Sequence, residues 1–405
     1  MTMDCEVLII GGGIHGAGVA QAAAAAGYRT LLLEKSDWAA GTSSKSSKLI
    51  HGGLRYLQSG EFRLVWECLH ERELLLRNAP ELVQRRDFYL PVYSDSHYRS
   101  WQIAAGLSLY TLLAGGRKGS RFKRLARETW QRQLRGLTLN GLQQVFQYQD
   151  AQTDDRLLTR AVINSARTLG AQTLNQAHFV EAQQQGREYR VRFEQAQQSQ
   201  EVSARVLVNA AGPWINQVNA RIKPAPPDLS VALVQGTHLV VKGKIADQCY
   251  YLEAPSDRRA VFAMPWYGNT LLGTTETLFR GEPDKVVPLP EEESYLLDVL
   301  TRYFPDRQPE VLDRFAGLRV LPQSQRQLFY RSRETRLLCD DSRCPGIISI
   351  YGGKLTSYRA TAAKVVHLLA RNIAVREPIA DTRKLRLNPD RDESAARGAN
   401  VGNEH

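Results

Sequence analysis

The fold of this protein is decided by residues 6–16, which read Glu-Val-Leu-Ile-Ile-Gly-Gly-Gly-Ile-His-Gly. A short apolar run is followed by glycines at 11, 13 and 16, the G-x-G-x-x-G pattern. Residues 14–26 are rich in alanine and predict a helix, and residues 30–33 predict a second buried strand. Together these segments predict a βαβ unit that binds a dinucleotide.

Each part of the pattern has a physical task in dinucleotide binding. Gly11 permits a sharp turn after the strand, Gly13 lets the backbone approach a pyrophosphate, and Gly16 lets helix and strand pack closely. The predicted helix begins at Ile14, where free N–H groups and the helix dipole attract phosphate. Glu34 ends the second strand and is placed to accept hydrogen bonds from a ribose. The alternative is a glycine-rich turn with no ligand.

Two later features favour FAD over NAD as the dinucleotide. Residues 172–207 alternate like a β-meander and lead into the small residues 210–212, a layout that flavoproteins use to complete the dinucleotide domain. Residues 346–351 predict a strand, and Gly352 and Gly353 then precede a helix that ends near residue 372. A helix start there could stabilise negative charge on a reduced flavin, although a plain helix start is the alternative.

Composition limits the classes of partner and the compartment. The chain has 405 residues, of which 43% are hydrophobic, and a net charge of +11 from 53 basic and 42 acidic residues. A nucleic acid, an anionic membrane or an acidic substrate could each explain the positive charge. The five cysteines are scattered without a C-x-x-C pair, so we expect no disulfide framework, no metal site and a reducing, cytoplasmic location. We expect neither a signal peptide nor a membrane-spanning helix.

The remaining patterns are coarse. Residues 62–78, 101–113 and 154–169 predict helices, and residues 231–241, 260–266 and 270–275 predict strands of a second sheet.

The sixteen residues 42–57, Thr-Ser-Ser-Lys-Ser-Ser-Lys-Leu-Ile-His-Gly-Gly-Leu-Arg-Tyr-Leu, resemble the signature of the aerobic FAD-dependent glycerol-3-phosphate dehydrogenases. Further blocks follow in the order of that family. They are residues 61–65, 154–157, 208–214, 236–238, 273–275, 317–319 and 351–359.

The resemblance implies an α/β plus α+β architecture like that of D-amino-acid oxidase. A Rossmann-like FAD-binding domain would comprise residues 1–85, 145–225 and 330–375. An inserted mixed-sheet substrate domain would comprise residues 86–144 and 226–329, and residues 376–405 would form a flexible tail without periodicity.

The resemblance also implies oxidation of sn-glycerol 3-phosphate to dihydroxyacetone phosphate, with hydride passing from C2 to N5 of a non-covalently held FAD and electrons passing to a membrane quinone. The cofactor-binding residues expected are Gly11, Gly13, Ile14, Gly16, Glu34, Thr42, Ser43, Ser44, Lys48, Leu49, His51, Gly52, Gly53, Ala211, Gly212, Trp214, Gly353, Lys354, Leu355 and Thr356.

A phosphorylated substrate needs cations, and arginine offers a planar fork where lysine offers a point charge. Arg319 and Lys354 are the first candidates for binding the phosphate, and we also expect Arg319 to be a catalytic residue. Arg55 and Tyr56 would add a charge and a hydroxyl. Arg331 also lies in a matching block, but Ser332 follows it where the family has Asp, which leaves its role open.

Oxidation of an alcohol also needs a base, and a neutral histidine suits that task. His238 is the first choice and His51 the second, although His51 could only position the flavin. His15 lies inside the phosphate loop and is interpreted as incidental.

The chain departs from the family in two places. The resemblance implies a further helical C-terminal domain of about a hundred residues, which we do not expect in this chain, and Glu276 stands where Asp is usual. Oligomeric state, including a homo-oligomer, is left open.

Residues 101–127 place apolar and basic side chains in succession, which suits the anionic inner face of the cytoplasmic membrane. A solvated basic helix is the alternative, and no motif accompanies a nucleic-acid interpretation. The competing functions are a related oxidase that uses O₂ or another hydroxy or amino substrate, and a non-catalytic FAD-binding paralogue.

Overall fold

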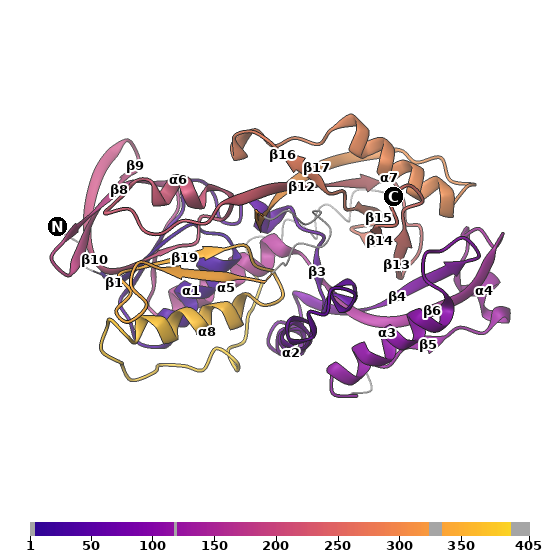
Figure 1. Ribbon diagram of the computed structural model, residues 1–405, viewed down its shortest axis with the longest axis horizontal. Helices are drawn as coiled ribbons and strands as arrows, with labels where there is room; N and C mark the ends of the chain where they lie inside the picture. Colours follow the sequence, from indigo (N-terminus) through magenta and orange to yellow (C-terminus); the bar gives the residue numbers. More distant parts are fainter. Residues whose placement is uncertain (1–4, 117–119, 324–333, 390–405) are drawn as a thin grey trace.

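The computed structural model describes residues 5–116, 120–323 and 334–389. Two large β-sheets lie beside each other along the long axis of the molecule, each with its own helices (Figure 1). The first sheet contains the N-terminal strand, and the second contains most of the strands between residues 83 and 322. This arrangement confirms a Rossmann-like sheet combined with a mixed, mostly antiparallel second sheet.

The centre of the first sheet is parallel. Strands β7 (Gln172–Leu174), β2 (Thr30–Leu33), β1 (Cys5–Ile10), β10 (Gln198–Asn209) and β19 (Ile347–Tyr351) pair side by side in that order. All six residues of β1 are buried. An unbroken apolar strand of this kind is expected where both faces of a parallel sheet are covered.

Antiparallel strands extend the first sheet on the side of β10 and β19. The first half of β10 pairs with β9 (Glu188–Gln195), which pairs with β8 (Ala177–Gln185), and this is the predicted meander. The short β11 (Ile222–Lys223) and β18 (Arg336–Cys339) extend the sheet beyond β8 and β19.

Three helices pack together beside the first sheet. Helix α1 (Ile14–Ala25) packs against α5 (Asp155–Thr168) and α8 (Tyr358–Leu369). Small alanine side chains make the contact of α1 close, because nearly all of its residues are buried. This packing fixes the position of the helix start, which follows the end of β1 by four residues.

The second sheet contains ten strands among the described residues. They are β3 (Leu49–Ile50), β4 (Val83–Tyr93), β5 (Lys123–Arg124), β6 (Leu142–Thr153), β12 (Val231–Val241), β13 (Cys249–Glu253), β14 (Ala260–Trp266), β15 (Asn269–Gly273), β16 (Thr277–Phe279) and β17 (Val311–Pro322). The long strand β12 pairs antiparallel with both β15 and β17. Helices α3 (Ser100–Leu113), α4 (Arg127–Gln133) and α7 (Pro290–Tyr303) lie with this sheet, and α2 (Phe62–Asn78) contacts α3 and β4.

The predicted helices and strands are present, with ends within a few residues of those expected. The sequence analysis did not predict β4, β6, β13, β17 or α7. Strands β4 and β6 run across residues 85/86 and 144/145, where domain boundaries were predicted, and both belong to the second sheet. The division into domains stays a prediction.

The sequence analysis placed residues 376–405 in a flexible tail, and residues 376–389 differ from that expectation. The backbone N–H of Ile379 donates to the carbonyl of Ala25 at 2.7 Å, and that of Leu387 donates to Asn78 at 2.8 Å. Arg376 pairs with Glu6 at 2.5 Å, and Leu387 is only 4% exposed. The polar composition of these residues suggested a free tail. The contacts could not be predicted because their hydrogen-bond partners are far away in the sequence. Residues 390–405 lie outside the described residues.

The described helices are all too short or too polar to span a bilayer.

Candidate active site

A cavity of about 500 Å³ is lined by residues of both sheets. The ends of β1, β2 and β10 contribute to it from the first sheet, and β12, β14 and β17 contribute from the second. The carboxyl ends of parallel strands are the usual ligand position in open α/β sheets. Most of the predicted site residues line this cavity. The exceptions are Gly16, Ser44, Lys48 and Gly52, while Arg331 lies outside the described residues.

The loop after β1 has the close packing that the glycine pattern predicts. Gly11 has φ +109°, and an ideal Cβ on Gly16 would lie 1.8 Å from the carbonyl oxygen of Gly11. The backbone N–H of Ile14 donates to Ser43 Oγ at 2.9 Å. Side chains larger than hydrogen would separate the loop from the helix, so the tight turn requires these glycines.

Glu34 lines the cavity at the end of β2, as predicted. One carboxylate oxygen accepts the N–H of Gly12 at 2.6 Å, and the other accepts the N–H of Ser36 at 2.8 Å. These bonds orient the carboxylate beside the phosphate loop. A carboxylate has further lone pairs, so it can still accept from ribose hydroxyls.

A second glycine turn, Gly352 and Gly353, follows β19 with φ values of +69° and +113°. An ideal Cβ on Gly353 would lie 2.0 Å from His15 Nε2, so the turn lies directly against the phosphate loop. Thr356 Oγ1 accepts the N–H of His51 at 3.1 Å. Three segments that are distant in sequence therefore meet at this turn.

Lys354 is half-buried at this turn, and its Nζ atom is buried. Its Nζ lies 3.6 Å from the centroid of the Tyr56 ring and has no hydrogen-bond partner among the described residues. An ammonium has three donors, and leaving them unsatisfied in a buried position is costly. The geometry therefore fits an anionic group in the cavity beside Lys354.

Lys48 has a different position from the one that its motif suggested. Its Nζ lies 2.5 Å from Asp155 Oδ1 and donates to the carbonyl of Ser44 at 2.5 Å. The other carboxylate oxygen of Asp155 accepts the N–H of Ser46 at 2.9 Å. Lys48 and Asp155 thus fix the backbone of residues 44–48. Lys48 itself does not line the cavity, whereas the nearby Ser43 and Ser47 do. The sequence analysis had grouped Lys48 with the residues that contact the cofactor.

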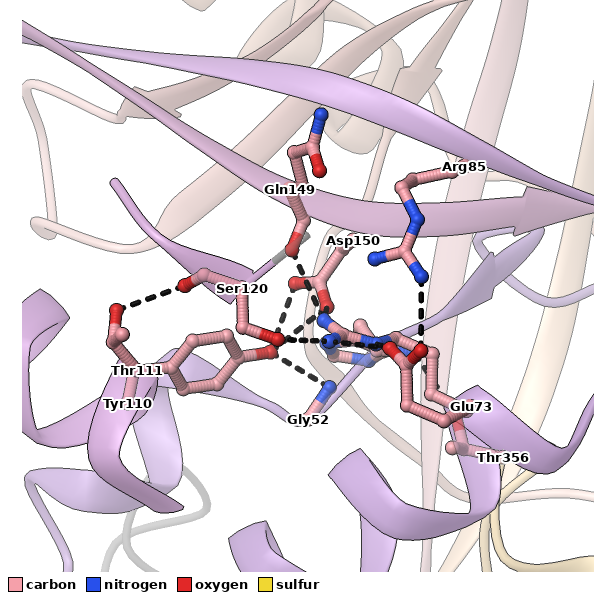
Figure 2. A network of polar contacts seen from close by, with 11 residues as sticks. Gly52, Glu73, Arg85, Tyr110, Thr111, Ser120, Gln149, Asp150 and Thr356 are labelled. Carbon is pink, nitrogen blue, oxygen red and sulfur yellow. Dashed lines mark hydrogen bonds and ion pairs between the residues drawn. The ribbon is translucent and has the colours of Figure 1, made fainter. Parts of the chain in front are cut away.

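The segment that contains His51 is held by residues that the sequence analysis missed. Figure 2 shows Tyr110 between the backbone of Gly52 and the carboxylate of Asp150, and Tyr110 Oη accepts the N–H of Gly52 at 2.8 Å. Tyr110 Oη lies 2.9 Å from each oxygen of Asp150. The guanidinium of Arg72 binds Asp150 at 2.6 Å and is fully buried.

Burial and charge act in opposite directions in this network. Burial alone would lower the pKa of Arg72, but its acidic neighbours and its hydrogen bond to Asp150 together raise it. Burial raises the pKa of Asp150, and the charge of Arg72 opposes that rise. The only sequence signal for the network was that Asp150 closely precedes the family-like block at 154–157. Tyr110 lies in an apolar run, and Arg72 lies on a helix whose contacts are not readable from sequence.

His238 lies on β12 and is 1% exposed. Its Nε2 is 2.9 Å from Ser47 Oγ, and its ring stacks on Phe315 with centroids 5.1 Å apart. Burial lowers the pKa of His238 well below its ordinary value, and the charges of Arg319 and Lys48 lower it further. The imidazole is therefore neutral at pH 7.

Arg319 lies on β17 opposite Val234 of β12, while Phe315 of β17 lies opposite His238. Arg319 Nη2 donates to Thr274 Oγ1 at 3.1 Å, and Arg319 Nη1 donates to the carbonyl of Thr275 at 3.4 Å. An ideal Cβ on Gly236 would lie 2.6 Å from Arg319 Nη2, so a larger residue at 236 would displace the guanidinium from this position.

Glu292 on α7 is hydrogen-bonded to β12 and to residues 275–277. This buried carboxylate accepts hydrogen bonds from the side chains of Gln235 and Thr237 at 2.6 and 2.5 Å, and from Thr275 and Thr277 at 2.7 Å each. Burial alone would raise the pKa of Glu292, but these hydrogen bonds together lower it below its usual range. The sequence analysis did not single out Glu292.

Arg55 also lines the cavity. Its Nη1 is 3.9 Å from a carboxylate oxygen of Glu276, which is also 3.9 Å from Arg259 Nη1. Glu276, the residue that departs from the family pattern, is thus a buried carboxylate between two arginines. Tyr56 adjoins Arg55 and forms the aromatic face beneath Lys354.

The two glycine turns, the acidic residue after β2 and the buried cations fit the pyrophosphate, ribose and flavin of FAD. A parallel dinucleotide-binding sheet joined to a mixed sheet around one such cavity defines a flavin-dependent oxidoreductase. The protein belongs to the FAD dependent oxidoreductase family (DAO), whose family model matches residues 6–359.

Similar proteins narrow the class. A glycerol-3-phosphate dehydrogenase of Pseudomonas aeruginosa is 38% identical over 365 residues, covering 88% of this chain and 70% of that protein. A D-erythritol 1-phosphate dehydrogenase of Brucella abortus is 35% identical over 373 residues, covering 90% and 73%. The structure of the glycerol-3-phosphate dehydrogenase from Bacillus halodurans complexed with FAD has a TM-score of 0.76 and 28% identity, covering 98% of this chain and 73% of that chain. The protein is therefore an FAD-dependent dehydrogenase of the glycerol-3-phosphate dehydrogenase group.

Proposed function

We propose that the protein oxidises the C2 hydroxyl of sn-glycerol 3-phosphate and releases dihydroxyacetone phosphate. The observation that carries the proposal is the buried ammonium of Lys354, which faces the cavity without a hydrogen-bond partner in the described structure. The guanidinium groups of Arg319 and Arg55 line the same cavity. A cluster of cations beside a flavin site suits a substrate that carries a phosphate.

The roles of the chain's residues follow from their positions. Lys354, Arg319 and Arg55 would bind the phosphate and orient the carbon skeleton. The neutral His238 would accept the hydroxyl proton, and Ser47 would hold the imidazole through its bond to Nε2. FAD, held non-covalently in the cavity, supplies the hydride acceptor.

The test is anaerobic reduction of the bound flavin. Glycerol 3-phosphate should bleach the absorbance of oxidised flavin at least as fast as the enzyme turns over in the steady state. Glycerol, which lacks the phosphate, should not bleach it. No bleaching by any phosphorylated polyol would favour the non-catalytic paralogue. Equal bleaching by glycerol would contradict the role of the cations.

D-erythritol 1-phosphate is the second candidate substrate, because the similar protein of Brucella abortus is named for it. It also carries a phosphate, so the cation cluster does not discriminate between the two. A comparison of kcat/KM for both substrates decides between them, since specificity is the ratio of these values.

We further propose that electrons pass to a membrane quinone at the anionic inner face of the cytoplasmic membrane. Helix α3 exposes Trp101 (69%) and Leu112 (72%). The nearby basic residues Arg121, Lys123, Arg124 and Arg127 are exposed as well, while Arg117 and Lys118 lie outside the described residues. Apolar and cationic side chains together suit a bilayer surface.

Vesicles test this proposal. The full chain should bind vesicles that contain anionic lipid at low salt and dissociate at high salt. Reoxidation by a quinone analogue should outpace reoxidation by O₂, and the reverse order would favour a related oxidase. Whether the protein forms a homo-oligomer is a separate question for light scattering.

A further inference from the structure

His15 lies at the junction between the phosphate loop and the second glycine turn. Its ring touches Gly353, where an ideal Cβ would be 2.0 Å from Nε2. The side chain lines the cavity. Its sequence position suggests an incidental residue, but His15 lies between the two backbone segments that flank the cofactor site.

Both ring nitrogens of His15 are buried, and neither has a hydrogen-bond partner in the part of the chain described. Burial lowers the pKa of His15 to about 4, so the ring is neutral at pH 7. A neutral imidazole carries one N–H donor and one acceptor nitrogen. Buried polar groups in proteins are nearly always hydrogen-bonded, so two orphaned nitrogens facing a cavity indicate a ligand.

The position indicates which part of FAD the ring would meet. The loop after β1 takes the pyrophosphate, because it ends at the N-terminus of α1. The turn at Gly352 and Gly353 lies beside Lys354 and Tyr56, and we expect the flavin at this end because the helix start after the turn suits the negative charge of a reduced flavin. The group that joins pyrophosphate to flavin is the ribityl chain, whose hydroxyls both donate and accept.

We propose that the imidazole of His15 is a hydrogen-bonding partner of the ribityl chain of FAD and fixes how the flavin end is held relative to the pyrophosphate. A neutral ring matches a polyol, because donor and acceptor can both be used. The role does not depend on which phosphorylated polyol the enzyme oxidises.

The experiment compares FAD and ADP binding to the apoprotein of the full chain. ADP carries the adenosine and phosphates but lacks the ribityl chain. His15→Leu removes both polar nitrogens, and His15→Asn retains a donor and an acceptor. His367→Leu, on a part of α8 away from the cavity, is the matched control.

His15→Leu should weaken FAD binding about tenfold or more, because a lost hydrogen bond to a buried group has that order of effect. ADP binding should be unchanged, His15→Asn should restore part of the FAD affinity, and the control should match wild type. The thermal midpoint of the apoprotein should stay the same or rise in His15→Leu, because unsatisfied buried groups are removed.

Two results would overturn the proposal. Equal weakening of FAD and ADP binding would place the contact at the phosphates rather than the ribityl chain. A lower apoprotein midpoint with unchanged affinity for FAD would show that His15 only packs against Gly353.

Discussion

The N–H of Gly52 donates a hydrogen bond of 2.8 Å to Tyr110 Oη. Tyr110 in turn bonds to Asp150, whose charge is balanced by the buried Arg72. Tyr110 belongs to helix α3, which lies with the second sheet. Through this bond, α3 holds the backbone of the segment that carries His51, Arg55 and Tyr56. The cavity wall is thus positioned by a buried polar network rather than by the loop alone.

Tyr110→Phe tests this relationship. The variant leaves the N–H of Gly52 without its acceptor and removes one bond to Asp150, so we expect a loss of about 1–3 kcal/mol in the free energy of unfolding. Affinity for FAD should also fall, because the Gly52 segment loosens. Urea unfolding and FAD titration measure the two effects. Tyr303→Phe removes a hydroxyl that accepts the N–H of Glu253 away from the cavity, and it is the control for stability alone. An equal loss of FAD affinity in both variants would contradict the positioning role.

His238→Ala tests the proton acceptor. FAD should remain bound, and kcat should fall by about 100-fold or more, because a positioned base contributes on that order. The measurement is steady-state turnover with glycerol 3-phosphate, alongside the flavin content of the purified variant. Turnover close to wild type would transfer the role to another group, with His51 as the next candidate.

Lys354→Met tests the anion site. The side chain keeps its length and loses its charge, so kcat/KM for the phosphorylated substrate should fall roughly ten- to a hundredfold, as for other hydrogen bonds to a charged group. Arg302→Met, at an exposed pair with Asp95, removes a cation elsewhere and should leave kcat/KM unchanged. A fall mainly in FAD content, with kcat/KM per bound flavin preserved, would assign Lys354 to the cofactor instead.

Glu292→Gln tests the hydrogen bonds that join α7 to β12 and to residues 275–277, and it carries a pH dependence. The folded-state pKa of Glu292 lies below its ordinary value of 4.5, so its carboxylate stabilises the fold above that value. The stabilisation is lost as pH falls from about 4.5 through the lower folded pKa. The difference in unfolding free energy between wild type and the variant should be about 1–3 kcal/mol at pH 7.

That difference should shrink below pH 4.5 as wild-type Glu292 takes up its proton. Urea unfolding at several pH values measures it. A difference that stays constant down to acid pH would mean that the side chain contributes by packing rather than by charge.

Local patterns explain which parts of the fold were predictable. The strand, glycine loop and helix of residues 5–25 are recognisable because their hydrophobic period and glycines lie next to one another in sequence. Strands β4 and β6 were missed because each mixes exposed and buried residues without clean alternation. The docked residues 376–389 were missed because their polar composition resembles that of a free terminus.

Lys48 and Asp155 show the same limit at the site. The motif around Lys48 was recognisable, but the direction of its ammonium was not, because Asp155 lies more than a hundred residues away. Tyr110 and Arg72 gave no signal for the same reason. A side chain's partner depends on which surfaces the sheets and helices bring together, and that information is not local.

The sequence by itself determined the dinucleotide-binding fold, the family and a set of candidate residues, because these depend on short patterns of glycine, apolar and charged residues. Only the tertiary structure decided which of those residues share a cavity. Pairing of β12 with β17 places Gly236 opposite Gly317, and His238 and Arg319, on either side of that pair, line the same cavity. Contact of Gly353 with His15 closes the cofactor site, because glycines leave room there that any other side chain would fill.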